Sequence, residues 1–483
     1  MRNSTDDHLV LFHSNDIHSR LENAARISAI INEERNRIGE DRVIAVDCGD
    51  HMDRMRMETE GSDGKVNVAL LEELRYDAIT LGNNEGLTYS RDVLNALYDG
   101  EHAFKVICAN LYEEKTGQRP TWMLPSAVIT RNGIRIALIA ATANFANFYL
   151  QLGWRSTDPI HAISKQLGLV RDKADIVIVM SHLGIHFDRR MAEELDGIDL
   201  IVGGHTHHLL EEPLFIKGAM LCAAGKFGDY VGRVVIGRDE ATGQIGVLSA
   251  EVIPTGAFEL RSEADTIIRR FASIAGERLG RRIASLGVAM PSSPDRESPL
   301  SNLLAAGLRE WMAADIGVVN AGQLLGGLPQ GEVTAGKLHS LCPSPINPCL
   351  MELSGANLRT ALEQSLLDEY RGKPIKGYGF RGEVLGMLAV DGLSITYDSA
   401  RPAMERIASV KVNGIPLDDS KLYAVGSIDM FSFKIGYESL ALAQSFHFFM
   451  PEFIRDVLER ELANEGAITA SFKSRWHSLS EFD

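Results

Sequence analysis

The sequence predicts a layered α/β domain, a connecting helix and a second domain in which helices and strands are mixed. Three observations lead to this fold class. The chain has 483 residues, more than one compact core accommodates. In its first half, short apolar runs alternate with helical patterns, as in a layered α/β domain. From Phe258 this alternation stops, so we expect domains at 1–257 and 285–483, with a linker helix at 258–284.

The predicted strands of the first half are short and rich in β-branched residues. An amphipathic helix is predicted over residues 24–38, between the first two of them. The strands are expected at residues 9–12, 43–46, 78–81, 134–140, 176–180 and 200–202.

The second half begins with apolar residues at helical spacing, from Leu260 to Ile274, which predict the linker helix ending near Gly280. Helices and strands are then mixed, and the dipeptide Asn413-Gly414 predicts a hairpin turn between two strand-like runs. Helices are expected at 299–313 and 355–369, and strands at 316–319, 393–398 and 407–412.

Composition excludes several classes of partner. Lys and Arg number 49 against 65 Asp and Glu, a formal charge of -16, which argues against a nucleic acid polymer. A small phosphorylated substrate is compatible with this net charge if metal ions supply local positive charge.

The sequence also bears on the location of the protein. No apolar run approaches the ~20 residues of a membrane span, and the polar residues 1–7 lack the apolar run of a signal peptide. The five cysteines form no CxxC pair, so we expect free thiols and a cytoplasmic location.

Metal-ligating residue types follow five of the predicted strands directly. In an open α/β sheet the loops at the carboxyl ends of strands converge on one crevice, so residues far apart in sequence can share a site. One loop histidine is more often structural, but five such motifs at strand ends indicate a common site. The candidate metal ligands are Asp16, His18, Asp50, Asn83, His182, His205 and His207.

These residue types suit a pair of metal ions, which needs one bridging carboxylate and terminal nitrogen or oxygen ligands. Asp50 is the expected bridge. Asp16, His18 and His207 would complete one site, and Asn83, His182 and His205 the other. Because no thiolate is involved, we expect two divalent ions drawn from Mn, Zn, Fe, Co and Mg.

The five motifs resemble those of the calcineurin-like metallophosphoesterases. The two-part length resembles the 5'-nucleotidase and UDP-sugar hydrolase family within them, and GNNEG at 82–86, PINPC at 345–349 and GFRG at 379–382 resemble its YunD-like cytoplasmic branch. The resemblance covers nearly the whole chain. It implies a four-layer αββα metal domain joined by a helix to an α+β nucleotide-binding domain. It also implies hydrolysis of nucleotide phosphoester or phosphoanhydride bonds by a metal-bridging hydroxide.

The chain departs from the family pattern beside the metal ligands. The family motif Gly-Asn-His-Glu-Phe-Asp provides a histidine that contacts the phosphate and an aspartate that orients it. Here Asn84 and Leu87 stand at those positions. We assign Asp50 and Asn84 as catalytic residues, with Asn84 able to donate one hydrogen bond to the phosphate. A carboxamide supplies no acid for the leaving oxygen, and His186 and His208 are alternative acids.

The resemblance also implies substrate-binding residues in the second domain. Phe431 and Phe433 lie where the family carries a phenylalanine that stacks on the base, and Phe380 is expected to form the other half of a clamp. The loop NAGQLL at 320–325 lacks the arginine that usually ends this family motif, so Arg381 is the expected replacement. Tyr378 is a further candidate, and core packing is the alternative for each aromatic residue.

Three functions remain open at this level. The first is a metal-dependent nucleotide hydrolase of the 5'-nucleotidase type. The second is a phosphodiesterase for cyclic nucleotides or nucleotide sugars, which uses the same metal ligands. The third, suggested by the missing histidine and aspartate, is a nucleotide-binding protein with weak or no catalysis.

Overall fold

The computed structural model describes residues 8–239 and 242–479 and divides into two compact units, Met1–Ala275 and Gly276–Asp483. The dividing point falls inside helix α9 (Ser262–Leu279). Residues 1–7, on which the expected absence of a signal peptide rests, lie outside the described residues. Within residues 8–239 and 242–479, no helix combines the length and apolar character that a membrane span requires.

Two sheets form the centre of the first unit. One has the strand order β15 (Ile245–Pro254), β14 (Tyr230–Arg238), β1 (Leu9–Ser14), β2 (Val43–Asp47), β3 (Ala78–Ile79), β4 (Lys105–Ile107) and β6 (Met123–Leu124). The other has the order β12 (Leu214–Ile216), β13 (Ala219–Ala223), β11 (Leu200–Gly203), β10 (Ile176–His182), β8 (Ile134–Thr142) and β7 (Ser126–Arg131). A short pair joins β5 (Leu111–Glu113) to β9 (Trp154–Ser156).

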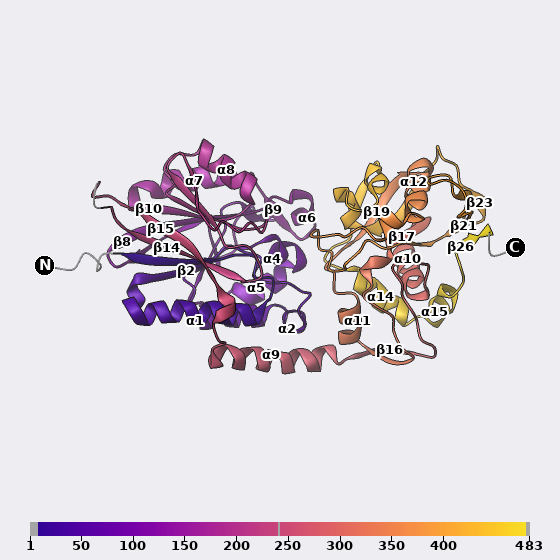
Figure 1. Ribbon diagram of the computed structural model, residues 1–483, viewed down its shortest axis with the longest axis horizontal. Coiled ribbons are helices and arrows are strands. Elements are labelled where there is room, and N and C mark those ends of the chain that lie inside the picture. The colour runs from indigo at the N-terminus through magenta and orange to yellow at the C-terminus, as the bar shows by residue number, and fades with distance from the viewer. Residues whose placement is uncertain (1–7, 240–241, 480–483) are drawn as a thin grey trace. The chain divides into compact units, whose positions relative to one another are not determined.

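Helices cover both outer faces of this pair of sheets (Figure 1). Alternate residues of β1 and β2 pack against alternate residues of β8 and β10 in one core between the sheets. The other face of β8 and β10 packs on α7 (Pro159–Val170) and α8 (Ile185–Glu194) in a second core. The four-layer αββα expectation is therefore confirmed. The helices are α1 (Leu21–Ile38), α2 (Met57–Gly61), α3 (Lys65–Glu73), α4 (Asn83–Thr88), α5 (Arg91–Tyr98), α6 (Ala146–Gln151), α7 (Pro159–Val170) and α8 (Ile185–Glu194).

The helix α9 lies where the linker was expected, and one face of it is buried. Ala264, Ile268 and Phe271 of α9 pack against α1 and α3. Burying this apolar stripe fixes the first part of α9 to the first unit.

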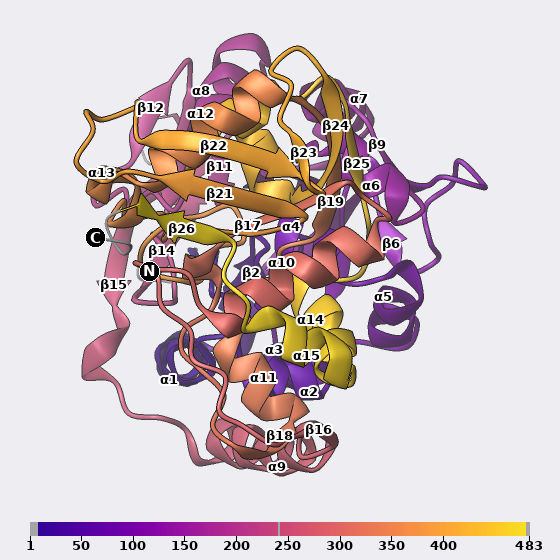
Figure 2. The same ribbon diagram turned by 90° about the vertical axis from the view of Figure 1, so that its right-hand side faces the viewer.

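The second unit contains two main sheets and a short strand pair. The larger sheet has the order β20 (Leu388–Asp391), β17 (Ile316–Asn320), β24 (Leu422–Ile428), β19 (Pro348–Ser354) and β25 (Phe446–Phe448). The smaller sheet, facing the viewer in Figure 2, has the order β23 (Ile415–Pro416), β22 (Ile407–Val412), β21 (Leu393–Tyr397) and β26 (Trp476–Ser478). The strands β16 (Arg282–Leu286) and β18 (Gly331–Thr334) pair separately. The helices are α10 (Pro299–Trp311), α11 (Ala335–Leu341), α12 (Gly355–Ser365), α13 (Asp368–Arg371), α14 (Ile454–Leu462) and α15 (Glu465–Ser471).

Two local predictions for this unit have different outcomes. The hairpin at Asn413-Gly414 is confirmed, because both residues have positive φ, 48° and 86°, and β22 pairs antiparallel with β23. The single helix predicted at 355–369 is wrong, because it divides into α12 and α13 at Leu367, whose backbone is extended. The hydroxyl of Ser365 accepts a hydrogen bond from the Leu388 N–H at 2.8 Å, which ties the end of α12 to β20.

Candidate metal centre

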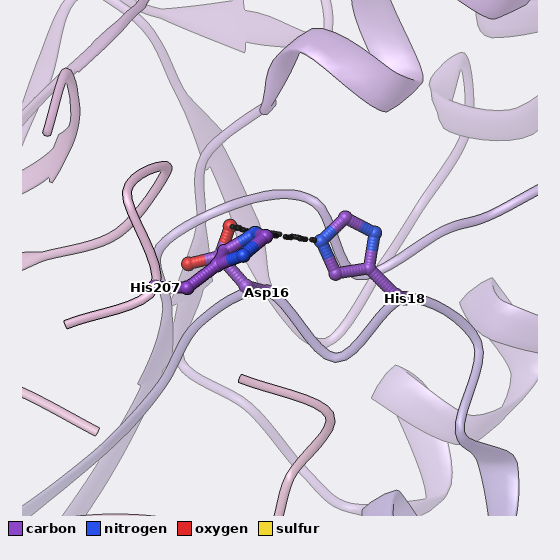
Figure 3. Close-up of side chains that lie close together, drawn as sticks. All are labelled: Asp16, His18 and His207. Carbon is purple, nitrogen blue, oxygen red and sulfur yellow. Dashed lines mark hydrogen bonds and ion pairs between the residues drawn. The ribbon is translucent and has the colours of Figure 1, made fainter. Parts of the chain in front are cut away.

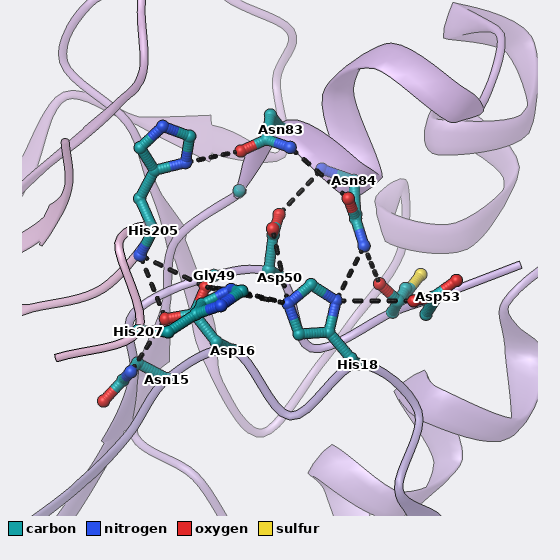
Figure 4. A network of polar contacts seen from close by, with 12 residues as sticks. Asn15, Asp16, His18, Gly49, Asp50, Asp53, Asn83, Asn84, His205 and His207 are labelled. Carbon is teal, nitrogen blue, oxygen red and sulfur yellow. Dashed lines mark hydrogen bonds and ion pairs between the residues drawn. The ribbon is translucent and has the colours of Figure 1, made fainter. Parts of the chain in front are cut away.

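Seven polar side chains converge at the carboxyl ends of five strands in the first unit, as the sequence predicted. Asp16 and His18 follow β1, Asp50 follows β2, and Asn83 begins α4 after β3. His182 is the last residue of β10, while His205 and His207 follow β11. Figure 4 shows most of this group in one view.

The backbone at this centre is strained. A non-glycine residue with positive φ costs free energy, and such residues gather at functional sites. Five of the seven candidate ligands have φ values from 47° to 72°: Asp16, His18, Asp50, His205 and His207. The loops are also tightly packed, because a Cβ added to Gly82 would lie 2.1 Å from the Asp50 carboxylate. The surrounding fold therefore holds this polar cluster in place against its local preferences.

Asp16, His18 and His207 form the first candidate ligand group (Figure 3). The Nε2 atoms of His18 and His207 are 3.1 Å apart. Those two atoms are 3.9 Å and 3.5 Å from Oδ1 of Asp16. Oδ2 of Asp50 lies 3.9 Å from Nε2 of His18, so it can reach the same ion. These residues, with Asp50, are the ones expected to hold the first of the two ions.

The second group lies on the other oxygen of Asp50. Oδ1 of Asp50 is 3.4 Å from Nε2 of His182. The Asn83 carbonyl oxygen lies 3.2 Å from the same nitrogen and 2.8 Å from Nδ1 of His205. Because its two oxygens face different histidine groups, the Asp50 carboxylate has the geometry of a bridge between two ions.

The contacts of His182 test whether a cation fits here. Its Nδ1 donates a hydrogen bond to the carbonyl of Cys48 at 2.8 Å, so in the neutral ring Nε2 carries a lone pair. That lone pair faces oxygen atoms of Asp50 and Asn83, which are also acceptors. Burial opposes protonation of His182, but the Asp50 carboxylate outweighs burial and raises the pKa of His182 to about 10. Positive charge between these atoms would satisfy all of them, and a bound divalent ion would supply it.

Two carboxylates that sequence reasoning missed, those of Glu85 and Asp53, hold the ligands in position. The Glu85 carboxylate accepts hydrogen bonds from the backbone N–H groups of Asp50, Met52 and Gly82 at 2.7–3.0 Å. Burial, and then the nearby Asp50 carboxylate, raises the pKa of Glu85 to about 7. The Asp53 carboxylate lies 3.5 Å from Nδ1 of His18. Such outer contacts orient metal-binding histidines and carboxylates.

Asn84 is buried, and its side chain already has protein partners. Its amide nitrogen donates to the Met52 carbonyl at 3.0 Å and lies 2.9 Å from Nδ1 of His18. Its backbone N–H donates to Oδ1 of Asp50 at 2.7 Å. In this conformation Asn84 orients His18 and Asp50, whereas the sequence suggested a hydrogen bond to the phosphate. The acid candidates His186 and His208 are exposed, and His208 Nδ1 lies 2.9 Å from the Thr206 hydroxyl.

The expected substrate residues of the second unit occupy different environments. Phe380 and Phe431 are 4 % and 0 % exposed, so both rings belong to the core and neither offers a face to a ligand. Phe433 is partly exposed and contacts Tyr378, which is 52 % exposed, with ring centroids 5.6 Å apart. Arg381 is partly exposed, and its backbone N–H donates to the Ser344 hydroxyl at 3.1 Å. The aromatic surface in this region therefore consists of Tyr378 and Phe433.

Replacement of Asp429 by asparagine is expected to change the pH dependence of stability in the second unit. Burial raises the pKa of Asp429 to about 7, from a value near 4 in the unfolded chain. The folded state therefore binds more protons between these values, and stability falls as the pH rises from about 4 to about 7. Asp429→Asn removes this slope and raises the free energy of unfolding at pH 8 by up to about 4 kcal/mol. Calorimetric unfolding from pH 5 to pH 8 measures both effects. The exposed Asp368→Asn variant is the control, and an unchanged slope in Asp429→Asn would contradict the prediction.

Two family models match the chain, the calcineurin-like phosphoesterase model over residues 9–209 and the 5'-nucleotidase C-terminal domain model over residues 279–441. The chain is 37 % identical to the uncharacterized metallophosphoesterase YunD of Bacillus subtilis, an alignment that covers 94 % of this chain and 99 % of YunD. A putative 5'-nucleotidase from Staphylococcus aureus has a similar fold, with a TM-score of 0.69, 19 % identity and coverage of 98 % and 100 % of the two chains. A 5'-nucleotidase precursor from Thermus thermophilus is also similar, with a TM-score of 0.61, 22 % identity and coverage of 98 % and 99 %.

Proposed function

Because the chain belongs to the calcineurin-like phosphoesterases that carry a 5'-nucleotidase C-terminal domain, a family of metal-dependent hydrolases, we propose that it cleaves phosphoester or phosphoanhydride bonds of nucleotides. The observation that carries this proposal is the convergence of two ligand groups on the two oxygens of Asp50. When bound, a pair of divalent ions would acidify a shared water and neutralise charge on the phosphoryl oxygens.

The protein's own residues would hold the ions in two groups that share Asp50. Asp16, His18 and His207 would hold one ion, and Asn83, His182 and His205 the other. The oxygen and imidazole donors suit Mn, Zn, Fe, Co and Mg. All five cysteines are unpaired and buried, which supports a reducing compartment such as the cytoplasm.

Leaving-group chemistry limits which nucleotides this centre would cleave quickly. General acid catalysis contributes about 10²–10⁴-fold, and a carboxamide at position 84 supplies none. The loss matters most for a ribose alkoxide, which is a strong base, and least for a phosphate or phenolate. We therefore propose nucleoside diphosphates and related anhydrides as better substrates than nucleoside monophosphates.

A panel of AMP, ADP, UDP-glucose and p-nitrophenyl phosphate tests this proposal on the Mn²⁺-loaded protein. We expect kcat/KM for ADP and for p-nitrophenyl phosphate to exceed that for AMP by about 100-fold or more, because their leaving groups need no acid. Release of inorganic phosphate from AMP and ADP, of UMP from UDP-glucose and of p-nitrophenolate from p-nitrophenyl phosphate measures the four rates. Faster turnover of AMP than of the other three compounds would refute the preference.

The same panel separates the proposed hydrolase from a nucleotide-sugar phosphodiesterase and from a nucleotide-binding protein. Turnover of UDP-glucose above that of ADP would favour a nucleotide-sugar phosphodiesterase. Binding of ADP in calorimetry without turnover of any compound would favour a nucleotide-binding protein. That alternative is suggested by Asn84 and Leu87, which stand where the family has its histidine and aspartate.

A further inference from the structure

Two cations beside the metal centre share one aromatic ring. The guanidinium carbon of Arg20 lies 4.9 Å from the centroid of the Phe227 ring, and Nζ of Lys226 lies 4.5 Å from the same centroid. Both distances are within the range of a cation–π interaction. Neither cation forms an ion pair within the described parts of the chain, residues 8–239 and 242–479.

The acidic side chains next to this cluster have other partners. Glu22 accepts a hydrogen bond from Arg56 at 2.7 Å. Asp229 accepts one from the side-chain amide of Asn23 at 3.1 Å. The protein therefore places two positive groups at 4.9 Å and 4.5 Å from the centroid of one ring, although its formal charge is -16. An anion that both groups can reach would reduce the repulsion between their charges.

Phe227, which carries the two cations, contacts two of the candidate metal ligands directly. The ring of Phe227 meets the ring of His18 edge to face, with centroids 5.8 Å apart. The Phe227 N–H donates to the carbonyl of Asp16 at 2.7 Å, and Arg20 is two residues beyond His18. The cations consequently lie on the side of the centre formed by Asp16 and His18.

The backbone of Phe227 supports a functional role for its position. Its φ is 63°, a conformation that is costly for a bulky residue. Glycine adopts this conformation without strain. The next residue, Gly228, is a glycine with a φ of 66°. Phe227 therefore shares the strained backbone conformation of the five neighbouring candidate ligands.

We propose that Arg20 and Lys226, supported by Phe227, bind the phosphate that is not transferred when the substrate carries two linked phosphates. This inference rests on the proposed hydrolysis and names its substrate class as diphosphates. In ADP, water adds its oxygen to the β-phosphorus, and the bond from that phosphorus to the bridging oxygen breaks. The bridging oxygen leaves with the electron pair on the α-phosphate of AMP, and the proton from water passes to solvent.

The subsite would also stabilise the phosphate leaving group. The α-phosphate of AMP gains one negative charge as it leaves, and Arg20 and Lys226 would stabilise that charge where it develops. Charge-assisted contacts of this kind contribute about 10- to 100-fold each. A substrate with a single phosphate, such as p-nitrophenyl phosphate, cannot use them.

The test compares Arg20→Ala and Lys226→Ala with the wild type on ADP and on p-nitrophenyl phosphate. We expect the ratio of the two kcat/KM values, ADP over p-nitrophenyl phosphate, to fall about 10- to 100-fold in each variant. Lys226→Arg keeps the charge and should keep the ratio. Lys105→Ala is the matched control, because it removes an exposed lysine at the start of β4, away from the carboxyl ends of the strands. A ratio within twofold of the wild type in both alanine variants would overturn the subsite.

A binding measurement keeps this test independent of turnover. Titration calorimetry of the Mn²⁺-loaded protein with methylenediphosphonate and with methylphosphonate gives the preference for two linked phosphonates. We expect that preference to fall about 10- to 100-fold in Arg20→Ala and Lys226→Ala. If no compound of the panel is hydrolysed, the proposed function fails. This titration alone then shows whether Arg20 and Lys226 bind a second phosphate. Equal affinities of the wild type for the two phosphonates would overturn it.

Discussion

Substitution of Asp50 by asparagine is expected to lower kcat/KM on p-nitrophenyl phosphate by about 1000-fold or more and to reduce the bound metal from two equivalents toward one. The two oxygens of Asp50 face His18 on one side and His182 on the other, at 3.9 Å and 3.4 Å. An amide has one acceptor oxygen, so asparagine cannot join both groups. Metal-ion stabilisation of developing charge is worth several kcal/mol, which corresponds to a rate factor of this size.

Metal content by plasma mass spectrometry and the rate of p-nitrophenolate release check this result together. Asp92→Asn on α5 is the control, because its carboxylate is 89 % exposed and lies outside the centre. The fold should persist in Asp50→Asn, since the Glu85 contacts to the same loop are made by backbone N–H groups. Full activity with two bound equivalents in Asp50→Asn would contradict the bridging role.

Installing histidine at position 84 and aspartate at position 87 together is expected to raise kcat/KM on AMP by about 100-fold or more. This pair recreates a positioned acid beside the phosphoryl group, which a poor leaving group needs and a phosphate leaving group does not. Rates on ADP should therefore change much less. Leu87 is partly exposed, so an aspartate there keeps its hydration, whereas Asn84 is buried and a larger ring must displace its contact with Met52.

The single variants separate acid catalysis from positioning. Asn84→His alone should give a smaller gain on AMP, because no carboxylate orients the ring. Asn84→Ala removes the amide that lies 2.9 Å from Nδ1 of His18 and should lower the rate on every substrate, because His18 loses an orienting contact. Steady-state kinetics on AMP and ADP with all three variants give the comparison. An unchanged AMP rate in the folded double variant would mean that acid catalysis does not limit this enzyme.

The site was predictable from sequence to the extent that it depends on strand ends. Each ligand motif follows an apolar β-branched run, and parallel strands deliver their following loops to one edge of a sheet. The supporting contacts were not predictable in this way. Glu85 stands within the predicted motif at 82–86, but its three bonds to backbone N–H groups depend on how two loops approach one another.

The aromatic residues of the second unit show where residue type is insufficient. Phe380 and Phe431 have the expected chemistry and order, yet both are buried, while Tyr378 and Phe433 remain accessible. Burying a large apolar ring is favourable both in a protein core and against a nucleotide base, so the sequence position of the ring does not distinguish a core residue from a base-stacking residue. The break between α12 and α13 has the same origin, because the contact of Ser365 with β20 is a long-range one.

The sequence by itself determined the two-domain α/β architecture, the seven candidate ligands and the absence of the usual histidine and aspartate at Asn84 and Leu87. These are local properties, set by the spacing of apolar residues and by the residues that end each strand. Only the tertiary structure decided that Asn84 contacts His18 and that Arg20 and Lys226 meet on Phe227. Those contacts join segments that are up to about 200 residues apart, and their geometry follows from the packing of the sheets, which no local pattern encodes.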